Sequence, residues 1–133
     1  MIEINSNVVV VVVVVFFSLS PQVVAADTFI YIGDLDDAFR LAGQALTDGG
    51  LFAFSVEDCD RSPMKKAVAG ATGDDDGFTL VASGRYAHTW QYLDSLARQH
   101  PFMYCFVQRI MVRMESAIPI PGYLCILQKT AAR

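Results

Sequence analysis

Asp27, Glu57 and His88 are the candidates in this sequence for general acid or base chemistry. His88 is one of only two histidines, and imidazole titrates near neutral pH, so this side chain could accept a proton or bind an acceptor group. The carboxylates could accept a proton or face a cation. Structural roles are the alternatives: a turn cap for Asp27, a solvated side chain for Glu57, and a helix-preceding position for His88.

No metal-binding pattern accompanies these residues. Cys59, Cys105 and Cys125 form no CxxC pair and no spaced zinc pattern, and their odd number favours a reducing compartment. The acidic run 74–76 lacks the spacing of a calcium-binding EF-hand and predicts a solvated loop. His100 is predicted to complement the end of a helix. We therefore expect no metal site, and we expect a cytoplasmic protein.

A strand–helix–strand unit is predicted to position the two carboxylates. One apolar strand over 23–26 ends at Asp27, and a second over 51–56 ends at Glu57. Between them, residues 34–50 predict a helix with an N-cap at its first aspartate and a stop at its two final glycines. Such a long crossover implies parallel strands. Both carboxylates should therefore lie at the carboxyl edge of an open α/β sheet, where ligands bind.

The rest of the chain predicts a loop, a second helix and two closing strands. Residues 59–77 are rich in turn formers, and a short extended piece follows at 78–82. Thr89 can cap a helix that ends near Gln99. A strand over 102–114 is then expected to turn at Pro119, Pro121 and Gly122 into a strand over 123–127. That last strand is apolar on both faces, which is typical of an interior strand.

Length, charge and the N-terminal segment exclude several classes of protein. The chain has 133 residues, enough for one domain, and a net charge of −4 with scattered basic residues, so we expect no nucleic-acid partner. The ten apolar residues Val8–Phe17 are too few to span a bilayer, so we expect no membrane partner. We interpret residues 1–22 as a valine-rich, low-complexity leader with strand propensity. A signal peptide cleaved after Ala26 is the alternative and would make the protein secreted.

The order of elements and several motifs resemble the second half of a class I S-adenosylmethionine-dependent methyltransferase. The resemblance covers residues 22–129. This part of the chain is similar to the small-molecule, type 11-like members of the family, including those fused to tetratricopeptide repeats. Its most specific pieces are Tyr31-Ile32-Gly33-Asp34-Leu35, the run 49–57 and Gly84-Arg85-Tyr86-Ala87-His88. In that family the last strand inserts between the fifth and sixth, which agrees with the two-sided apolar strand at 123–127.

The resemblance implies both a fold and a site. The fold is α/β: a partial Rossmann-like sheet from the fourth strand onward, mainly parallel, with a C-terminal antiparallel hairpin and with residues 23–133 as the C-terminal part of the domain. The implied cofactor is S-adenosylmethionine, bound at Ala26 and Asp27. The implied acceptor is a small molecule contacted by Tyr31, Arg85 and Tyr86, with His88 and Glu57 as catalytic residues.

The sequence departs from that family on the cofactor side. No GxG precedes Asp27, so we expect a truncated member without the glycine-rich cofactor motif. The alternative function is a non-catalytic interaction module, because an open edge of the strand at 23–26 would invite a partner strand or an oligomer. Residues Val8–Phe17 could instead cover this edge. The connection of about five residues, 18–22, requires that such a pairing be antiparallel.

Overall fold

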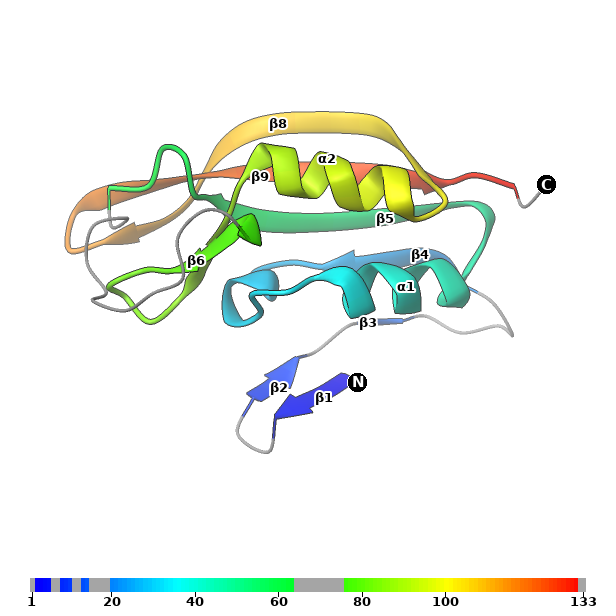
Figure 1. Cartoon of the computed structure of the whole chain (residues 1–133), viewed down its shortest axis with the longest axis horizontal. Helices are drawn as coiled ribbons and strands as arrows, with labels where there is room; N and C mark the ends of the chain where they lie inside the picture. The colour runs from blue at the N-terminus through cyan, green and yellow to red at the C-terminus, as the bar shows by residue number, and fades with distance from the viewer. Residues whose placement is uncertain (1, 6–7, 11–12, 15–19, 64–75, 132–133) are drawn as a thin grey trace.

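A computed structural model describes residues 2–5, 8–10, 13–14, 20–63 and 76–131. In this part of the chain, seven strands form one mixed sheet, and β1 and β2 form a separate pair (Figure 1). The elements, in chain order, are β1 (Ile2–Asn5), β2 (Val8–Val10), β3 (Val13–Val14), β4 (Ser20–Ala25), the 3₁₀ turn η1 (Phe29–Tyr31), α1 (Asp36–Ala45), β5 (Leu46–Asp58), β6 (Phe78–Leu80), β7 (Tyr86–His88), α2 (Trp90–Gln99), β8 (Phe102–Glu115) and β9 (Ile118–Lys129).

β5 is the central strand of the sheet. β4 pairs with it in parallel, from Gln22 opposite Leu51 to Ala25 opposite Phe54, as the strand–helix–strand pattern predicted. β9 pairs with the other edge of β5 in antiparallel orientation, and β8 pairs with β9. The last strand of the chain is therefore an interior strand, which confirms the prediction from its two-sided apolar character.

β7 is a short strand that the sequence did not reveal. It runs parallel to β5, with Glu57 opposite Ala87 and Asp58 opposite His88. Because β9 already occupies one edge of β5 at Glu57, β7 must lie on the side of β4, beyond the point where β4 ends. β6 pairs with β7 in antiparallel orientation. The last three residues of the motif at 84–88 are thus part of the sheet.

The first helix, α1, is shorter than predicted at both ends. Its N-cap is Leu35, while the Asp34 carboxylate accepts a hydrogen bond from the Asp36 backbone N–H at 3.0 Å. Its last residue is Ala45, and the next residue already begins β5. Gly49, with φ of 79°, lies inside β5, where the register with β4 shifts. The glycines predicted to end the helix therefore form an irregularity in a strand.

The second helix, α2, begins as predicted. The Thr89 side chain accepts a hydrogen bond from the Tyr92 backbone N–H at 3.1 Å, the geometry of an N-cap. Leu93, Leu96 and Ala97 form its buried side.

The turn between the last two strands lies earlier than predicted. Ser116 and Ala117, with φ of 47° and 65°, make a two-residue turn between β8 and β9. Pro119 and Pro121 lie within β9 instead of in the turn. They precede Gly122, where pairing with β5 begins, so the strand tolerates prolines at its unpaired edge.

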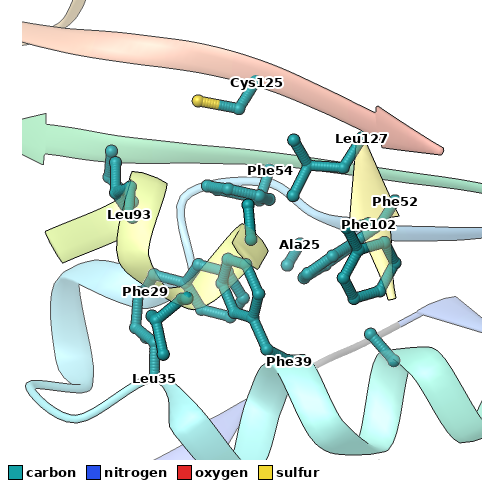
Figure 2. Packing of buried hydrophobic residues seen from close by; sticks show 14 of the residues in the cluster. Ala25, Phe29, Leu35, Phe39, Phe52, Phe54, Leu93, Phe102, Cys125 and Leu127 are labelled. Carbon is teal, nitrogen blue, oxygen red and sulfur yellow. The ribbon is translucent and has the colours of Figure 1, made fainter. Parts of the chain in front are cut away.

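The core lies between the sheet and the two helices. Phe39 of α1 packs its ring against those of Phe52 at 5.3 Å, Phe54 at 5.5 Å and Phe102 at 5.9 Å (Figure 2). Leu93 of α2 joins the same cluster. Burial of each such side chain contributes about 1.5–3 kcal/mol. We call this side of the sheet the helix face and the opposite side the open face.

β3 covers the outer edge of β4. Val13 pairs with Val24 and Val14 with Val23 in antiparallel orientation, which confirms the orientation that the short connection required. Among the described residues, no helix has the length and apolar character needed to cross a bilayer.

Candidate functional site

The carboxyl ends of three parallel strands meet at one edge of the sheet, on the left in Figure 1. β4 leads there into Ala26 and Asp27, β5 ends with Glu57 and Asp58, and β7 ends with His88. Ligands bind at this edge in open α/β sheets. Asp27, Glu57 and His88, which the sequence singled out, therefore follow neighbouring strand ends.

Asp27 turns the chain sharply away from β4. Its φ is 51°, in the left-handed region, and its backbone N–H donates to the Ser55 hydroxyl at 3.0 Å. The next residue, Thr28, donates its hydroxyl to the Ala26 carbonyl at 2.9 Å. A non-glycine residue in this conformation costs about 1–3 kcal/mol, and such positions cluster at functional sites. The Asp27 carboxylate is exposed and has no hydrogen bond or ion pair with any described residue.

Tyr31 lies close behind in the chain and is presented to solvent. Phe29 and Ile30 anchor η1 in the interior, each 2% exposed, whereas Tyr31 is 50% exposed. This exposure excludes core packing as its role. Acceptor binding by Tyr31 stays a prediction.

Glu57 is fully buried, so the structure excludes a solvated role for it. Its two carboxylate oxygens accept hydrogen bonds from the Ser62 hydroxyl at 3.1 Å and from Arg113 Nη2 at 3.0 Å. Arg113 also donates through Nε to Glu115 at 2.8 Å, and Arg85 donates to the same carboxylate oxygen at 2.5 Å. The result is a four-residue ion network that we call the acidic–basic chain: Glu57, Arg113, Glu115 and Arg85.

In the acidic–basic chain, the interactions with carboxylates affect the pKa of Arg113 more than burial does. Burial lowers the pKa of Arg113, but hydrogen bonds from Glu115 and Glu57 raise it more, so the net direction is upward. A carboxylate held in this way stabilises a neighbouring cation. In this geometry Glu57 and predicted acceptor residue Arg85 belong to one network, although they share no direct contact.

His88 is fully buried and joins β7 to the loop after β4. Its Nε2 lies 2.9 Å from the Gly33 carbonyl oxygen, to which it donates as the neutral ring. Burial lowers the pKa of His88 to about 4, although the backbone hydrogen bonds oppose this shift. The Nδ1 atom has no hydrogen-bond partner in the described part of the chain.

The two motifs that carried the family resemblance lie against each other. A Cβ at Gly33 would come within 2.7 Å of the Phe78 ring and 2.9 Å of the Tyr86 ring, so only glycine permits this contact. Tyr92 adds a second link, because its hydroxyl donates to the Asp34 carboxylate at 3.1 Å and accepts from the Leu35 N–H at 2.9 Å. The half-buried Tyr86 therefore flanks the loop that carries Tyr31.

Sequence reasoning missed Ser55, Arg113 and Glu115. The alternation of charged residues along the strand at 102–114 was a usable signal, because it places Arg113 and Glu115 on one face. The pairing of Arg113 with Glu57 depends on the register of β9 between β5 and β8, which no local pattern gives. No cluster of His, Cys, Asp and Glu suited to a metal ion is present among the described residues.

Neither a family model nor a curated protein matches this sequence. Solved structures do match. An S-adenosylmethionine-dependent methyltransferase of Methanosarcina mazei aligns with a TM-score of 0.62 and 15% identity over 88% of this chain and 64% of its own. A Listeria monocytogenes protein assigned as an S-adenosylmethionine-dependent methyltransferase aligns with a TM-score of 0.60 and 17% identity, over 94% of this chain and 66% of its own. A third S-adenosylmethionine-dependent methyltransferase, from Mesorhizobium loti, aligns with a TM-score of 0.58 and 17% identity, over 84% of this chain and 62% of its own.

The sequence identities are too low to carry more than the fold, and the chain spans slightly less than two thirds of the length of each of these methyltransferases. Within that limit all three matches agree with the predicted α/β architecture. The described chain therefore has the fold of class I S-adenosylmethionine-dependent methyltransferases.

Proposed function

We propose that this chain takes part in the transfer of a methyl group from S-adenosylmethionine to a small-molecule acceptor, as a family member without the glycine-rich cofactor motif. The observation that carries the proposal is the fold, shared over 84–94% of the chain with three methyltransferases. The geometry at Asp27 supports it, because a strained turn there presents a carboxylate that no described residue pairs with at the ligand-binding edge.

The residues at the end of β4 fit part of the cofactor. A carboxylate without a partner among the described residues suits a cationic group, and Asp27 and Ala26 would hold the cofactor's positively charged end. When bound, S-adenosylmethionine would supply a methyl group on a sulfonium, which the acceptor atom takes by in-line displacement. Such a reaction depends mainly on alignment of the two reactants. In this proposal Ser55 fixes the Asp27 turn and hence the alignment.

The other predicted site residues would act on the acceptor side. We assign acceptor contacts to the exposed Tyr31 and to Tyr86. Glu57 and His88 are buried and hydrogen-bonded, so we assign them positioning roles: Glu57 holds Arg113, and His88 holds the loop at Gly33. Arg85 reaches the same network through Glu115 and completes the acceptor side.

Calorimetric titration with S-adenosylhomocysteine, the demethylated product, tests this proposal. We expect saturable binding that weakens at least tenfold in an Asp27→Asn variant, because the substitution removes the charge but keeps the shape. Asp48→Asn is the matched control, since Asp48 is an exposed aspartate near the opposite end of β5. Absence of heat at millimolar ligand, or equal weakening by both substitutions, would contradict the proposal.

The open face of the sheet favours a second candidate function, a non-catalytic interaction module. Val24, Ala53, Ile126 and Phe106 are successive cross-strand partners and form one row on this face. The end residues of the row, Val24 and Phe106, are 41% and 44% exposed. An apolar row with this exposure is typical of a surface that another polypeptide covers. In this candidate the chain binds a protein partner through its sheet and has no catalytic role.

A further inference from the structure

A pocket of about 460 Å³ opens on the helix face, beside the end of β5, where Asp58 pairs with His88. None of the predicted site residues lines it. It lies between the end of β5, the start of α2 and the middle of β8 and β9, and we call it the helix-face pocket. Small-molecule sites usually have volumes of roughly 300–1,000 Å³. Because successive residues of a strand point to opposite faces, Asp58 lines this pocket while Glu57 points to the open face.

The Asp58 carboxylate is already satisfied by the protein. It is fully buried and accepts hydrogen bonds from the backbone N–H of Asp60 at 2.9 Å and from the Arg61 side chain. The Arg61 guanidinium also lies over the Tyr123 ring, 5.5 Å from its centroid. Asp58 and Arg61 therefore form an ion pair with no net charge, so neither side chain needs a charged ligand as its partner.

Arg109 supplies a charge that no described residue pairs with. It lies directly opposite Tyr123 in the register of β8 and β9, on the same face as the pocket. It is exposed and makes no hydrogen bond or ion pair with any described residue. The guanidinium offers five N–H donors in a planar fork that fits a carboxylate. Asp60, the other charge at the pocket, is also exposed, so a cationic ligand has to be tested alongside an anionic one.

The aromatic residues that line the pocket beside this charge pack against one another. The Trp90 ring packs against Tyr104 at 5.2 Å and against Tyr123 at 5.4 Å. Val107, 38% exposed, continues the apolar wall along β8. A flat apolar group could cover Trp90 and Val107 while an attached acid reached Arg109. Because the Trp90 indole is already held in place, a ligand ring can stack on it without the entropy cost of ordering this side chain.

We propose that the helix-face pocket binds a small molecule that joins an aromatic ring to a carboxylate. Trp90 and Val107 contact the ring, and Arg109 binds the carboxylate. The site goes beyond methyl transfer, because it uses none of the residues assigned to the cofactor or the acceptor. It needs no S-adenosylmethionine, so a negative result for either site leaves the other untouched.

Trp90 makes the test direct, because it is the single tryptophan of the chain. Its fluorescence is followed while the full chain is titrated separately with phenylacetate, phenylacetamide and phenethylamine. These probes share a ring and differ in carrying a negative, a neutral or a positive group. We expect a saturable change with phenylacetate and at least tenfold weaker binding of the other two probes.

Two variants test whether Arg109 is the residue that binds the carboxylate of phenylacetate. Arg109→Gln is expected to weaken the binding of phenylacetate at least tenfold, and it removes no hydrogen bond or ion pair with a described residue. Arg98→Gln is the matched control, because Arg98 is an exposed arginine of α2 that pairs with Asp94 outside the pocket. No saturable change with phenylacetate, unaltered binding in Arg109→Gln, or tighter binding of phenethylamine would each overturn the proposal.

Discussion

Glu57 is a buried carboxylate whose charge is balanced by the Arg113 guanidinium, itself only 15% exposed. Replacing Arg113 by leucine leaves that charge without its partner, and we expect the free energy of unfolding to fall by about 3–5 kcal/mol. Adding Glu57→Leu should recover most of the loss, because a buried pair replaced by apolar groups is often neutral. Urea denaturation measures both effects.

An exposed ion pair provides the control for this prediction. Arg40 and Asp37 are 48% and 81% exposed, so Arg40→Leu should change the free energy of unfolding by at most about 0.5 kcal/mol. A loss as large as that of Arg113→Leu would show that burial is not what makes the Glu57 pair important.

His88 predicts a pH dependence of stability. Its folded pKa, about 4, is below the ordinary value of 6.5, so the unfolded chain binds the proton more tightly. The neutral His88 side chain therefore contributes to the free energy of unfolding in full above pH 6.5. This contribution, on the order of 3 kcal/mol, is lost as the pH falls from 6.5 to 4. Urea denaturation from pH 7 to pH 4 should show this slope in the natural chain and not in His88→Gln. The same slope in both proteins would assign it to other groups.

At the scale of elements, Gly122 of β9 lies in close contact with β5 and β8. A Cβ there would come 2.2 Å from the Val56 carbonyl oxygen and 2.4 Å from the Val112 side chain. We therefore expect Gly122→Ala to lower the free energy of unfolding by about 1–3 kcal/mol, through displacement of β9 from β5. Thermal denaturation measures the change.

Gly43 offers the matched control for that substitution. It lies in α1, and the nearest atoms to a Cβ there are 3.9 Å away. Gly43→Ala should therefore stabilise the protein by about 0.5–1 kcal/mol, since alanine is the better helix former. Destabilisation by both substitutions would indicate that packing around Gly122 is not specially close.

Elements with a strong local signal could be predicted from the sequence. The Thr89 cap and the apolar spacing behind it gave α2, and two-sided apolar runs gave the parallel pair of strands. β7 and the turn at Ser116 could not be predicted in this way. Three residues carry too little pattern for a strand, and the prolines of β9 are conventional turn signals that the unpaired edge of that strand tolerates.

The site was predictable only in part, for a related physical reason. A carboxylate at a strand end marks the ligand-binding edge, so Asp27 could be found from local sequence. Whether Glu57 is solvated or buried depends on Arg113, which follows it by 56 positions and meets it through strand register. Long-range pairing of this kind leaves no trace in the spacing of nearby residues.

At the scale of the whole molecule, α1 and α2 cover one face of the sheet, and no helix of the described residues covers the other. We expect the row that ends in Phe106 to drive concentration-dependent self-association, because burying an exposed phenylalanine is favourable. Light scattering with size-exclusion chromatography should show a mass that rises with concentration and returns to the monomer in Phe106→Ser.

The control for self-association is on the other face of the same strand. Met111 is 56% exposed and pairs with Pro121 on the helix face, so Met111→Ser should leave the association unchanged. A monomer at every concentration in the natural chain would contradict the role of the open face and weaken the interaction-module candidate.

Amide chemical-shift mapping with S-adenosylmethionine tests the central claim most directly, because it locates any binding on the sheet. The account predicts saturable shifts centred on residues 26–28 and Ser55, the groups that form and hold the turn after β4. The same shifts should be lost in Asp27→Asn. No shifts at millimolar concentration, or shifts confined to residues away from the carboxyl edge, would contradict a cofactor site at this end of the sheet.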